Sequence, residues 1–492
     1  MNFLRFKTDK FFYIYDINTN HILKVDNCLW RSAGIKDVND PRAEQLLKGF
    51  GASQRTNSLA KIRELQEKHN VLADRLPLKG LSFPKTVDEV VEELNSKLDH
   101  IILNLTERCN FRCSYCKFGV SYGFADGRYS ERMPEAVALR AIDFLVERNA
   151  QGKSCRVGFY GGEPLLAFPM IKQLVEYAKI KSSKPVKFAL TTNGSLLTIE
   201  ILKFLIRHDF SLTISLDGPE RLHDRYRRTV KDQPTFDTIL RHINVIKSAD
   251  PHYYERKVGF SVVLAPPYHL LEVIDFFSDD SVYTEAPVFF SLVDPNDTTF
   301  YDQFDKREIR KEYGEQIEIL KQELLQNFIH AEDGKLKSKR AKVISELLGK
   351  RYFSVHNRAI FPLGEFCYPN GVCTPGLQRS FVTVRGELGV CERMGESWII
   401  GDVFRGFSRW AIAELITTYV KISSEKCSRC WAVRLCTCCY LDARKGEGLS
   451  IEKKEQMCGG RKKNLAQAMI EYCRVMELNP HAFDSIKSDL GS

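Results

Sequence analysis

The middle of the chain alternates between short apolar runs and longer stretches whose apolar residues recur at helical spacing. The apolar runs predict strands at 100–106, 155–161, 187–192, 211–217, 257–264 and 287–293. The stretches between them predict helices at about 133–149, 168–181, 198–208, 234–248 and 268–278. This alternation favours parallel βα units and an α/β fold. Six units are fewer than the eight of a complete barrel, so residues 96–300 are predicted to form a partial (β/α)6 barrel with its chemistry at the C-terminal ends of the strands.

Residues 1–95 have a different pattern, which predicts a small α+β domain at the N-terminus. The runs FFYIYD (11–16) and HILKVD (21–26) predict two strands joined by a turn at 17–20. Amphipathic helical stretches follow at about 41–49 and 58–70. Residues 71–95 contain Pro77 and Pro84 and are predicted to be a connector.

The remaining third of the chain divides into a charged segment and a cysteine-rich segment. Residues 301–360 include charged helical sequence over 303–350 and are predicted to bridge the barrel and the C-terminal region. A coiled-coil surface for a partner is the alternative, although the stretch is short for one. Residues 361–492 are predicted to form a separate cysteine-rich domain.

Composition and charge exclude little but direct attention to the cysteines. The chain has 72 basic and 63 acidic residues, a surplus of +9 that is spread out and does not predict a nucleic-acid partner. No run of 18 apolar residues predicts a membrane span, and the N-terminus lacks a secretory signal, so a cytoplasmic location is expected. The cytosol keeps thiols reduced, so disulfides are a poor explanation for 15 cysteines. Their clustering at short spacings instead favours metal sites.

The first cluster is Cys109, Cys113 and Cys116, a CxxxCxxC spacing directly after the first predicted barrel strand. Three thiolates can hold three corners of an iron–sulfur cubane and leave the fourth iron without a protein ligand. An open coordination position distinguishes a catalytic metal site from a closed structural one. The alternative is a zinc knuckle with a fourth ligand elsewhere.

This motif, with Tyr115 before its third cysteine, resembles the signature of the radical S-adenosylmethionine (radical SAM) superfamily. The resemblance implies that the open iron binds the amino and carboxylate groups of S-adenosylmethionine, and that the reduced 4Fe–4S cluster cleaves the cofactor to a 5′-deoxyadenosyl radical. Further segments resemble the family's cofactor contacts at the ends of successive strands. The residues that the resemblance assigns to S-adenosylmethionine are Tyr115, Gly161, Gly162, Glu163, Pro164, Thr192, Asn193, Ser215, Asp217, Arg227 and Val263.

Several of these assignments have roles in the family. The GGEP motif at 161–164 is implied to receive the methionine amino group through its backbone and Glu163, although alone it is equally typical of a tight turn. Ser215 is the expected contact at the end of the fourth strand. Arg227 is expected to face the cofactor carboxylate, with a solvated charge near a helix start as the alternative. The backbone near Val263 is expected to border the adenine.

The second cysteine array resembles the SPASM domain, which holds two auxiliary 4Fe–4S clusters in radical enzymes that modify peptides and sulfatases. The resemblance assigns Cys367, Cys373, Cys391 and Cys439 to auxiliary cluster I and Cys427, Cys430, Cys436 and Cys458 to auxiliary cluster II. The family's spacing would put one ligand at Tyr440, so either Cys438 or Cys439 takes this place, and Cys439 is nearer to the expected register. A pair of structural zinc sites is the alternative, since CxxC is also a zinc spacing.

The resemblance implies an enzyme that modifies a ribosomally made precursor peptide. The N-terminal pattern resembles the element that binds the leader of such precursors as an added strand. A cysteine thioether crosslink is the expected product, and carbon–carbon cyclisation is the next choice. The rivals are an anaerobic sulfatase-maturating enzyme and, outside enzymes, a zinc-binding interaction protein. Auxiliary clusters with four protein ligands each are expected to transfer electrons rather than to bind substrate. A flavodoxin or ferredoxin is expected to be the electron donor of the enzyme. The sequence identifies no catalytic base.

Overall fold

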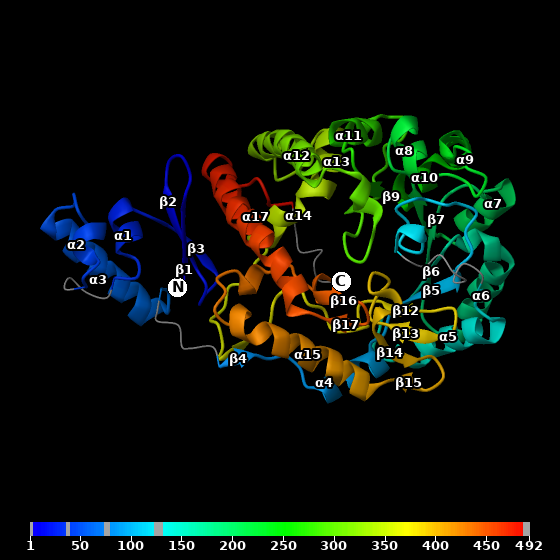
Figure 1. Ribbon diagram of the computed structural model, residues 1–492, viewed down its shortest axis with the longest axis horizontal. Helices are drawn as coiled ribbons and strands as arrows, with labels where there is room; N and C mark the ends of the chain where they lie inside the picture. Colours follow the sequence, from blue (N-terminus) through cyan, green and yellow to red (C-terminus); the bar gives the residue numbers. More distant parts are fainter. Residues whose placement is uncertain (1–2, 36–39, 73–78, 123–130, 486–492) are drawn as a thin grey trace.

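The computed structural model describes residues 3–35, 40–72, 79–122 and 131–485, and a central sheet organises most of the molecule (Figure 1). Its strand order is β10-β9-β8-β7-β6-β5-β12-β13-β14-β15. Six strands from β5 to β10 are mutually parallel. These strands are β5 (His100–Thr106), β6 (Cys155–Gly161), β7 (Val186–Thr192), β8 (Ser211–Ser215), β9 (Val258–Leu264) and β10 (Val288–Leu292). The α/β fold with six parallel strands is thus confirmed.

The helices between these strands cover the sheet, and their apolar residues form one continuous core with it. They are α5 (Glu135–Glu147), α6 (Phe168–Lys181), α7 (Ile199–Arg207), α8 (Glu220–Tyr226), α9 (Phe236–Ala249), α10 (Pro251–Lys257) and α11 (Leu270–Ser278). The five predicted helices are present, whereas α8 and α10 were not predicted because seven residues are too few for a clear period. Strand β8 ends two residues before the prediction, since the backbone N–H of Asp217 donates to His223 Nδ1 (3.3 Å).

The cysteine-rich region extends this sheet, which the sequence did not predict. Strand β12 pairs in parallel with β5, and β13 to β15 continue the sheet in antiparallel order. They are β12 (Ser380–Val382), β13 (Glu387–Gly389), β14 (Ile399–Asp402) and β15 (Gly406–Phe407). These strands have two to four residues each, which is too short for an alternation of apolar and polar positions to be recognised. The described sheet therefore runs from β10 to β15 through both regions.

The N-terminal unit projects from one end of the main body (Figure 1). Its strands β1 (Phe3–Lys7), β2 (Phe12–Asp16) and β3 (His21–Val25) form an antiparallel sheet in the order β1-β2-β3. The helices α1 (Asn27–Ser32), α2 (Ala43–Leu46) and α3 (Ala52–His69) follow. Strand β1 was not predicted. The predicted connector contains β4 (Gly80–Leu81) and α4 (Val87–Ser96), whose first turn is capped by Thr86 and Glu89.

Further helices, from 4 to 28 residues long, follow the six parallel strands in the sequence. They include α12 (Lys306–Ile329), α13 (Lys339–Leu348), α14 (Lys350–His356), α15 (Arg409–Cys427), α16 (Tyr440–Ala443) and α17 (Ile451–Leu478), with β11 (Phe366–Cys367), β16 (Arg444–Lys445) and β17 (Gly448–Leu449) between them. Short 3-10 turns are η1 (Val120–Tyr122), η3 (Pro164–Ala167), η4 (Phe300–Gln303), η5 (Gly395–Ser397) and η6 (Val433–Leu435). Helix α12 buries Leu320, Leu324 and Phe328 and packs against α11, α13 and α17, so its apolar face is covered within the chain. No helix in the described ranges has the length and apolarity that a membrane span requires.

Candidate cofactor and cluster sites

The three N-proximal cysteines lie on one loop that follows β5. Backbone hydrogen bonds attach this loop to the end of α8: Arg112 N donates to Arg228 O (2.7 Å) and Ser114 N donates to Tyr226 O (3.1 Å). A further bond from Cys116 N to Cys113 O (2.9 Å) closes a turn between the second and third cysteines. The loop is therefore fixed at the C-terminal edge of the parallel sheet, where chemistry was predicted.

The structure brings these three thiols together, and each is free of a disulfide. Burial raises the pKa of Cys109 to about 11 and that of Cys113 to about 12, and neighbouring cysteines add to both shifts. Burial also raises the pKa of Cys116. Thiols with raised pKa values stay protonated until a metal or cluster binds them as thiolates. This buried group fits a cluster with three protein ligands.

Beside the thiols lies a buried network of Tyr115, Asp217 and Arg227. Arg227 Nη1 donates to the Tyr115 hydroxyl (3.0 Å), and this hydroxyl donates to Asp217 Oδ2. Asp217 Oδ1 accepts the backbone N–H of Val263 (3.0 Å). Burial raises the pKa of Asp217, and the charge of Arg227 opposes that shift. Because Arg227 follows α8 at its C-terminus and is only 7% exposed, the alternative of a solvated charge is wrong.

Arg227 also has an unused donor. Its Nε is buried and has no hydrogen-bond partner within the described ranges. A buried donor without a partner costs about 1–3 kcal/mol. A carboxylate arriving beside the three thiols would satisfy it, so this residue fits the cofactor contact that the resemblance implies.

Glu163 is a fully buried link between two strand ends. Its Oε1 accepts Leu165 N (3.0 Å) and Thr192 Oγ1 (2.7 Å), and its Oε2 accepts Asn193 N (2.7 Å). Burial raises its pKa, and the two backbone donors oppose the shift. The carboxylate thus joins the segment after β6 to the end of β7. Its contact with an amino group stays a prediction, because three of its acceptor positions already serve the protein.

The two glycines before Glu163 bring the chain close to the cysteine loop. A Cβ on Gly162 would lie 2.4 Å from Arg108 O, and one on Gly161 would lie 2.3 Å from Thr106 O. Gly161 also has φ +140°, which disfavours other residues. Pro164 is buried and begins the short turn η3. The glycines therefore allow a backbone approach that any side chain would prevent.

Three further predicted contacts lie around the same edge. Asn193 Nδ2 donates to Asn110 Oδ1 (2.8 Å) and approaches Cys109 Sγ at 3.9 Å. Ser215 is half-buried at the end of β8. Val263 packs beside Tyr115 and Phe300. The structure thus gathers residues from the ends of β5 to β9 around one loop.

Asn110 and Lys117 were missed by the sequence reasoning, although both lie in or directly after the cysteine motif. Asn110 donates to Ser195 Oγ (2.8 Å) and so ties the motif to the loop after β7. Lys117 Nζ donates to the backbone carbonyl of Arg393, two residues beyond Cys391. Lys117 therefore connects the first cysteine loop to the C-terminal array, a contact that separation in sequence concealed.

The C-terminal cysteines fall into two groups that separate Cys438 from Cys439. Cys373 has its pKa raised to about 12 by burial and by the nearby Cys391 and Cys439. Cys438 instead lies with Cys436 and Cys458: its backbone N–H donates to Cys436 Sγ (3.4 Å), and its thiol is within hydrogen-bonding reach of both sulfurs. This proximity lowers the pKa of Cys436 to about 7 and that of Cys458 to about 6, while the pKa of Cys438 rises. Cys439 thus faces the first group and Cys438 the second.

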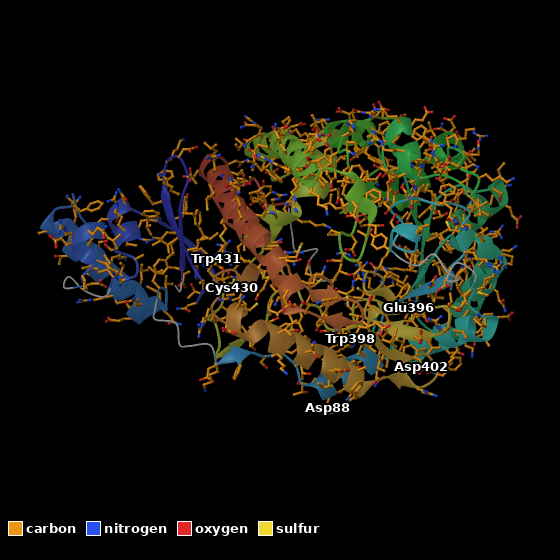
Figure 2. The ribbon with its side chains drawn as sticks, viewed as in Figure 1. Asp88, Glu396, Trp398, Asp402, Cys430 and Trp431 are labelled. Carbon is orange, nitrogen blue, oxygen red and sulfur yellow. The ribbon has the colours of Figure 1, made fainter. Side chains whose placement is uncertain are left out.

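The second group lines a cavity of about 700 Å³ between α17 and the end of α15. Its lining includes Cys427, Cys430, Cys436, Cys438 and Cys458. Figure 2 shows Cys430 and Trp431 between the N-terminal strands and α17. A group of thiols that lines a cavity fits a cluster, whereas a cysteine packed in the apolar core, such as Cys155 at 1% exposed, does not.

Ligands of a single ion such as zinc converge on one centre at about 2.3 Å for sulfur. Across the residues that the structure describes, no group of three or more His, Cys, Asp and Glu side chains is arranged to hold a metal ion. The fit to iron–sulfur clusters therefore depends on the grouping of the thiols, their burial and the cavity.

Residues 103–265 match the radical SAM superfamily. The chain therefore contains a radical SAM domain, an enzyme domain that uses S-adenosylmethionine and a 4Fe–4S cluster, and the resemblance drawn from the Cys109 to Cys116 spacing is confirmed. The matched region coincides with β5 to β9 and includes the three cysteines.

The chain is similar in sequence to a sulfatase-maturating enzyme and to a cyclopropyl synthase. The chain is 23% identical over 361 residues to the cysteine-type anaerobic sulfatase-maturating enzyme of Clostridium perfringens, covering 69% of this chain and 87% of that enzyme. It is 23% identical over 283 residues to the radical SAM cyclopropyl synthase TigE of Paramaledivibacter caminithermalis, covering 54% of this chain and 53% of TigE. The chain spans about half the length of the first curated relatives it matches, 49%, 53% and 42%.

The fold is also similar to a solved structure, that of native anSMEcpe with bound AdoMet and the Cp18Cys peptide. The TM-score is 0.54 at 18% identity, over 78% of this chain and 99% of that one. This likeness concerns the fold alone and agrees with the predicted α/β architecture.

Proposed function

We propose that this protein is a radical SAM maturase that binds a ribosomally made precursor peptide by its leader and installs an intramolecular cysteine thioether. The observation that carries the proposal is the N-terminal sheet, in which β3 is an outer strand of the order β1-β2-β3 and pairs, among the described residues, with β2 alone. An outer strand of this kind accepts an extended peptide as an added strand. The three helices after it complete a small three-stranded, three-helix unit that matches the leader-binding resemblance.

The contacts of this unit with the rest of the protein support a role in substrate delivery. Arg434 donates from Nη1 to the carbonyls of Ile17 (3.1 Å) and Asn18 (2.8 Å), in the turn between β2 and β3. The ring of Tyr15 meets that of Trp431 edge to face, with centroids 6.4 Å apart. The sheet is therefore held against the loop that carries Cys430, so a leader on β3 would extend from a fixed point.

The relatives support a peptide substrate of this chemical class. A sulfatase-maturating enzyme of the cysteine type and a cyclopropyl synthase share its radical SAM sequence. The peptide-bound structure with a similar fold is a case in which a peptide and AdoMet occupy one such architecture.

Three cofactor sites belong to the proposal. Cys109, Cys113 and Cys116 would hold the cluster that binds S-adenosylmethionine, which supplies a 5′-deoxyadenosyl radical when bound. Cys367, Cys373, Cys391 and Cys439 would hold auxiliary cluster I, and Cys427, Cys430, Cys436 and Cys458 would hold auxiliary cluster II. Arg227 would orient the cofactor carboxylate, and Gly161 and Gly162 would offer backbone to its amino group. A small electron carrier such as a flavodoxin or ferredoxin would supply the reducing electron.

The decisive experiment is anaerobic co-expression with a short cysteine-containing peptide encoded beside this gene. Joining the cysteine sulfur to a carbon removes one hydrogen from each, so we expect the peptide to lose two hydrogens per crosslink in mass spectrometry. The crosslink should resist thiol alkylation and fragment as a ring. Deleting the leader should reduce conversion by about 100-fold or more, since the strand that docks on β3 is lost.

The alternative product is formylglycine in a sulfatase, favoured by the 87% coverage of the Clostridium perfringens enzyme. A cysteine-containing sulfatase peptide offered under the same conditions distinguishes the two. Formylglycine formation without any crosslink in the precursor would overturn the peptide-maturase proposal. Colourless protein that binds zinc and makes no 5′-deoxyadenosine would overturn both.

A further inference from the structure

A buried lysine lies inside the cavity that the five C-terminal thiols line. Lys454 is in the first turn of α17 and only 1% of its side chain is exposed. It lines the same cavity as Cys427 and Cys458. Lysine is among the residues least often fully buried, because an ammonium loses its hydration unless the protein replaces it.

The protein replaces that hydration with sulfur, hydroxyl and aromatic groups. Lys454 Nζ donates to Cys427 Sγ at 3.2 Å and also to Ser423 Oγ. The ammonium lies 4.4 Å from the centroid of the Tyr419 ring, a cation–π contact. Across the described ranges, no carboxylate lies within ion-pairing distance of Lys454. In a bound cluster, the thiolate ligands of the cavity would supply the compensating negative charge.

The other described cations that line the cavity differ in this respect. Arg461 pairs with Asp442, and Lys426 pairs with Glu455 while its side chain is 64% exposed. The remaining three are at least partly exposed: Arg351, Arg429 and Lys462. Lys454 is thus the described cation of this cavity that combines full burial with a direct contact to sulfur.

We infer that Lys454 is a positioning residue that sets the reduction potential of auxiliary cluster II through its contact with Cys427. The inference rests on the proposed ligation of that cluster by Cys427, Cys430, Cys436 and Cys458. Reduction adds one electron to the cluster and moves no proton. A fixed positive charge stabilises the reduced, more negative form more than the oxidised form, and hydrogen bonds to cluster sulfur act in the same direction.

Removing the charge should therefore make the cluster harder to reduce. For Lys454→Gln we expect the equilibrium constant of one-electron reduction to fall by about tenfold or more, which corresponds to ~59 mV. Lys454→Arg keeps the charge, so its reduction constant should stay within about threefold of the wild-type value. Lys462→Gln is the matched control from the same helix and cavity, and its expected change is under about threefold because solvent screens its charge.

The measurement is a redox titration followed by electron paramagnetic resonance, with iron content, on the full chain carrying alanine at Cys109, Cys113 and Cys116. Only auxiliary signals remain in this background. One of the two signals should shift in Lys454→Gln, while the other stays in place. Equal potentials in Lys454→Gln and wild type, at equal iron content, would overturn the inference.

Two outcomes separate this inference from the proposed function. If the background protein binds no second auxiliary cluster, the proposed ligand set has failed. If Lys454→Gln loses iron, the Lys454→Arg variant decides the question. Full iron content and an unchanged reduction potential in Lys454→Arg would support the charge as the cause. A tenfold change in its reduction constant, despite the retained charge, would overturn the inference.

Discussion

The two cysteine regions of this protein gather thiols in different ways. The first uses one loop at the end of β5, and the ends of four neighbouring strands surround it. The second uses short strands, turns and the helices α15 and α17, which bring together cysteines far apart in sequence. The first region therefore holds three thiols on one segment at a sheet edge, whereas the second assembles a larger set of thiols around a cavity of about 700 Å³.

A buried cation in each region shows the same difference. Arg227 meets Tyr115 and Asp217 and keeps an unsatisfied Nε, so it can still receive an anionic group. Lys454 donates directly to Cys427 and to Ser423. A free donor fits recognition of a cofactor, whereas a donor already committed to sulfur fits the tuning of a resident cluster.

The largest expected effect tests the three-thiol loop. Cys113→Ala should abolish 5′-deoxyadenosine formation, by at least about 1,000-fold, and remove about four irons per chain, because one cluster loses a ligand. Iron analysis and the anaerobic cleavage assay measure both. The control is Cys155→Ala, which removes a buried thiol outside both regions and should keep its iron. Full cleavage activity in Cys113→Ala would contradict the assignment.

The next effect tests the division between Cys438 and Cys439. We expect Cys439→Ala to lose the iron of auxiliary cluster I, about four per chain, while Cys438→Ala keeps it. The reason is that Cys439 lies with Cys373, whereas Cys438 lies with Cys436 and Cys458. The measurement compares the iron content and the electron paramagnetic resonance spectra of the two variants with those of the wild type. The reverse pattern would show that Cys438 is the ligand.

A smaller effect concerns the open donor of Arg227. Lysine at this position keeps the charge beside Asp217 but lacks the planar fork of donors. Loss of a hydrogen bond to a charged group costs about 1.5–3 kcal/mol, so Arg227→Lys should bind S-adenosylmethionine roughly 10- to 100-fold more weakly. Equilibrium dialysis with the reconstituted protein measures this. Arg225→Lys on α8, the helix just before Arg227, is the control, and equal affinity in both variants would remove Arg227 from the cofactor site.

The smallest effect is a pH dependence of stability centred on His223. Burial and the charge of Arg227 hold its pKa well below 6.5, and its Nδ1 accepts the N–H of Asp217. The folded protein therefore keeps this histidine neutral, while the unfolded chain protonates it below pH 6.5. Stability is fully present above that pH and falls by up to about 1.4 kcal/mol per unit below it.

Chemical denaturation at pH 5.0 to 7.5 of wild type and His223→Gln measures this contribution. The variant has no imidazole to protonate, so the slope should be shallower by up to one proton between pH 6.5 and 5. Identical slopes in the two proteins would show that His223 does not set this dependence.

Long-range packing accounts for most of what the sequence could not predict. Strands β5 and β6 match their predictions residue for residue, because long apolar runs between helices leave one interpretation. The short strands β12 to β15 join this sheet through the pairing of β12 with β5, a contact between segments far apart in the sequence. Helices α8 and α10 were not predicted because each has only seven residues. Asp217 was predicted to lie in the fourth strand, but β8 ends at Ser215 and the backbone N–H of Asp217 donates to His223 instead.

The candidate site shows the same limit. The spacing of the cysteines was enough to locate Cys109, Cys113 and Cys116. The burial of Arg227 and its free Nε depend instead on how distant segments pack around that side chain. The spacing could not decide whether Cys438 or Cys439 is a ligand of auxiliary cluster I. These two neighbours face different groups of cysteines, and spacing does not predict in which direction each side chain points. Lys454 carries no motif, and only the packing of α17 against α15 brings its ammonium to Cys427.

The sequence by itself determined the alternation of strands and helices, the radical SAM motif and the two sets of cysteines, because these depend on local periodicity and fixed spacing. The tertiary structure decided the continuation of the sheet into the C-terminal region, the separation of two adjacent cysteines and the contacts of buried charges. These depend on which distant segments exclude water together, and local sequence does not specify such contacts.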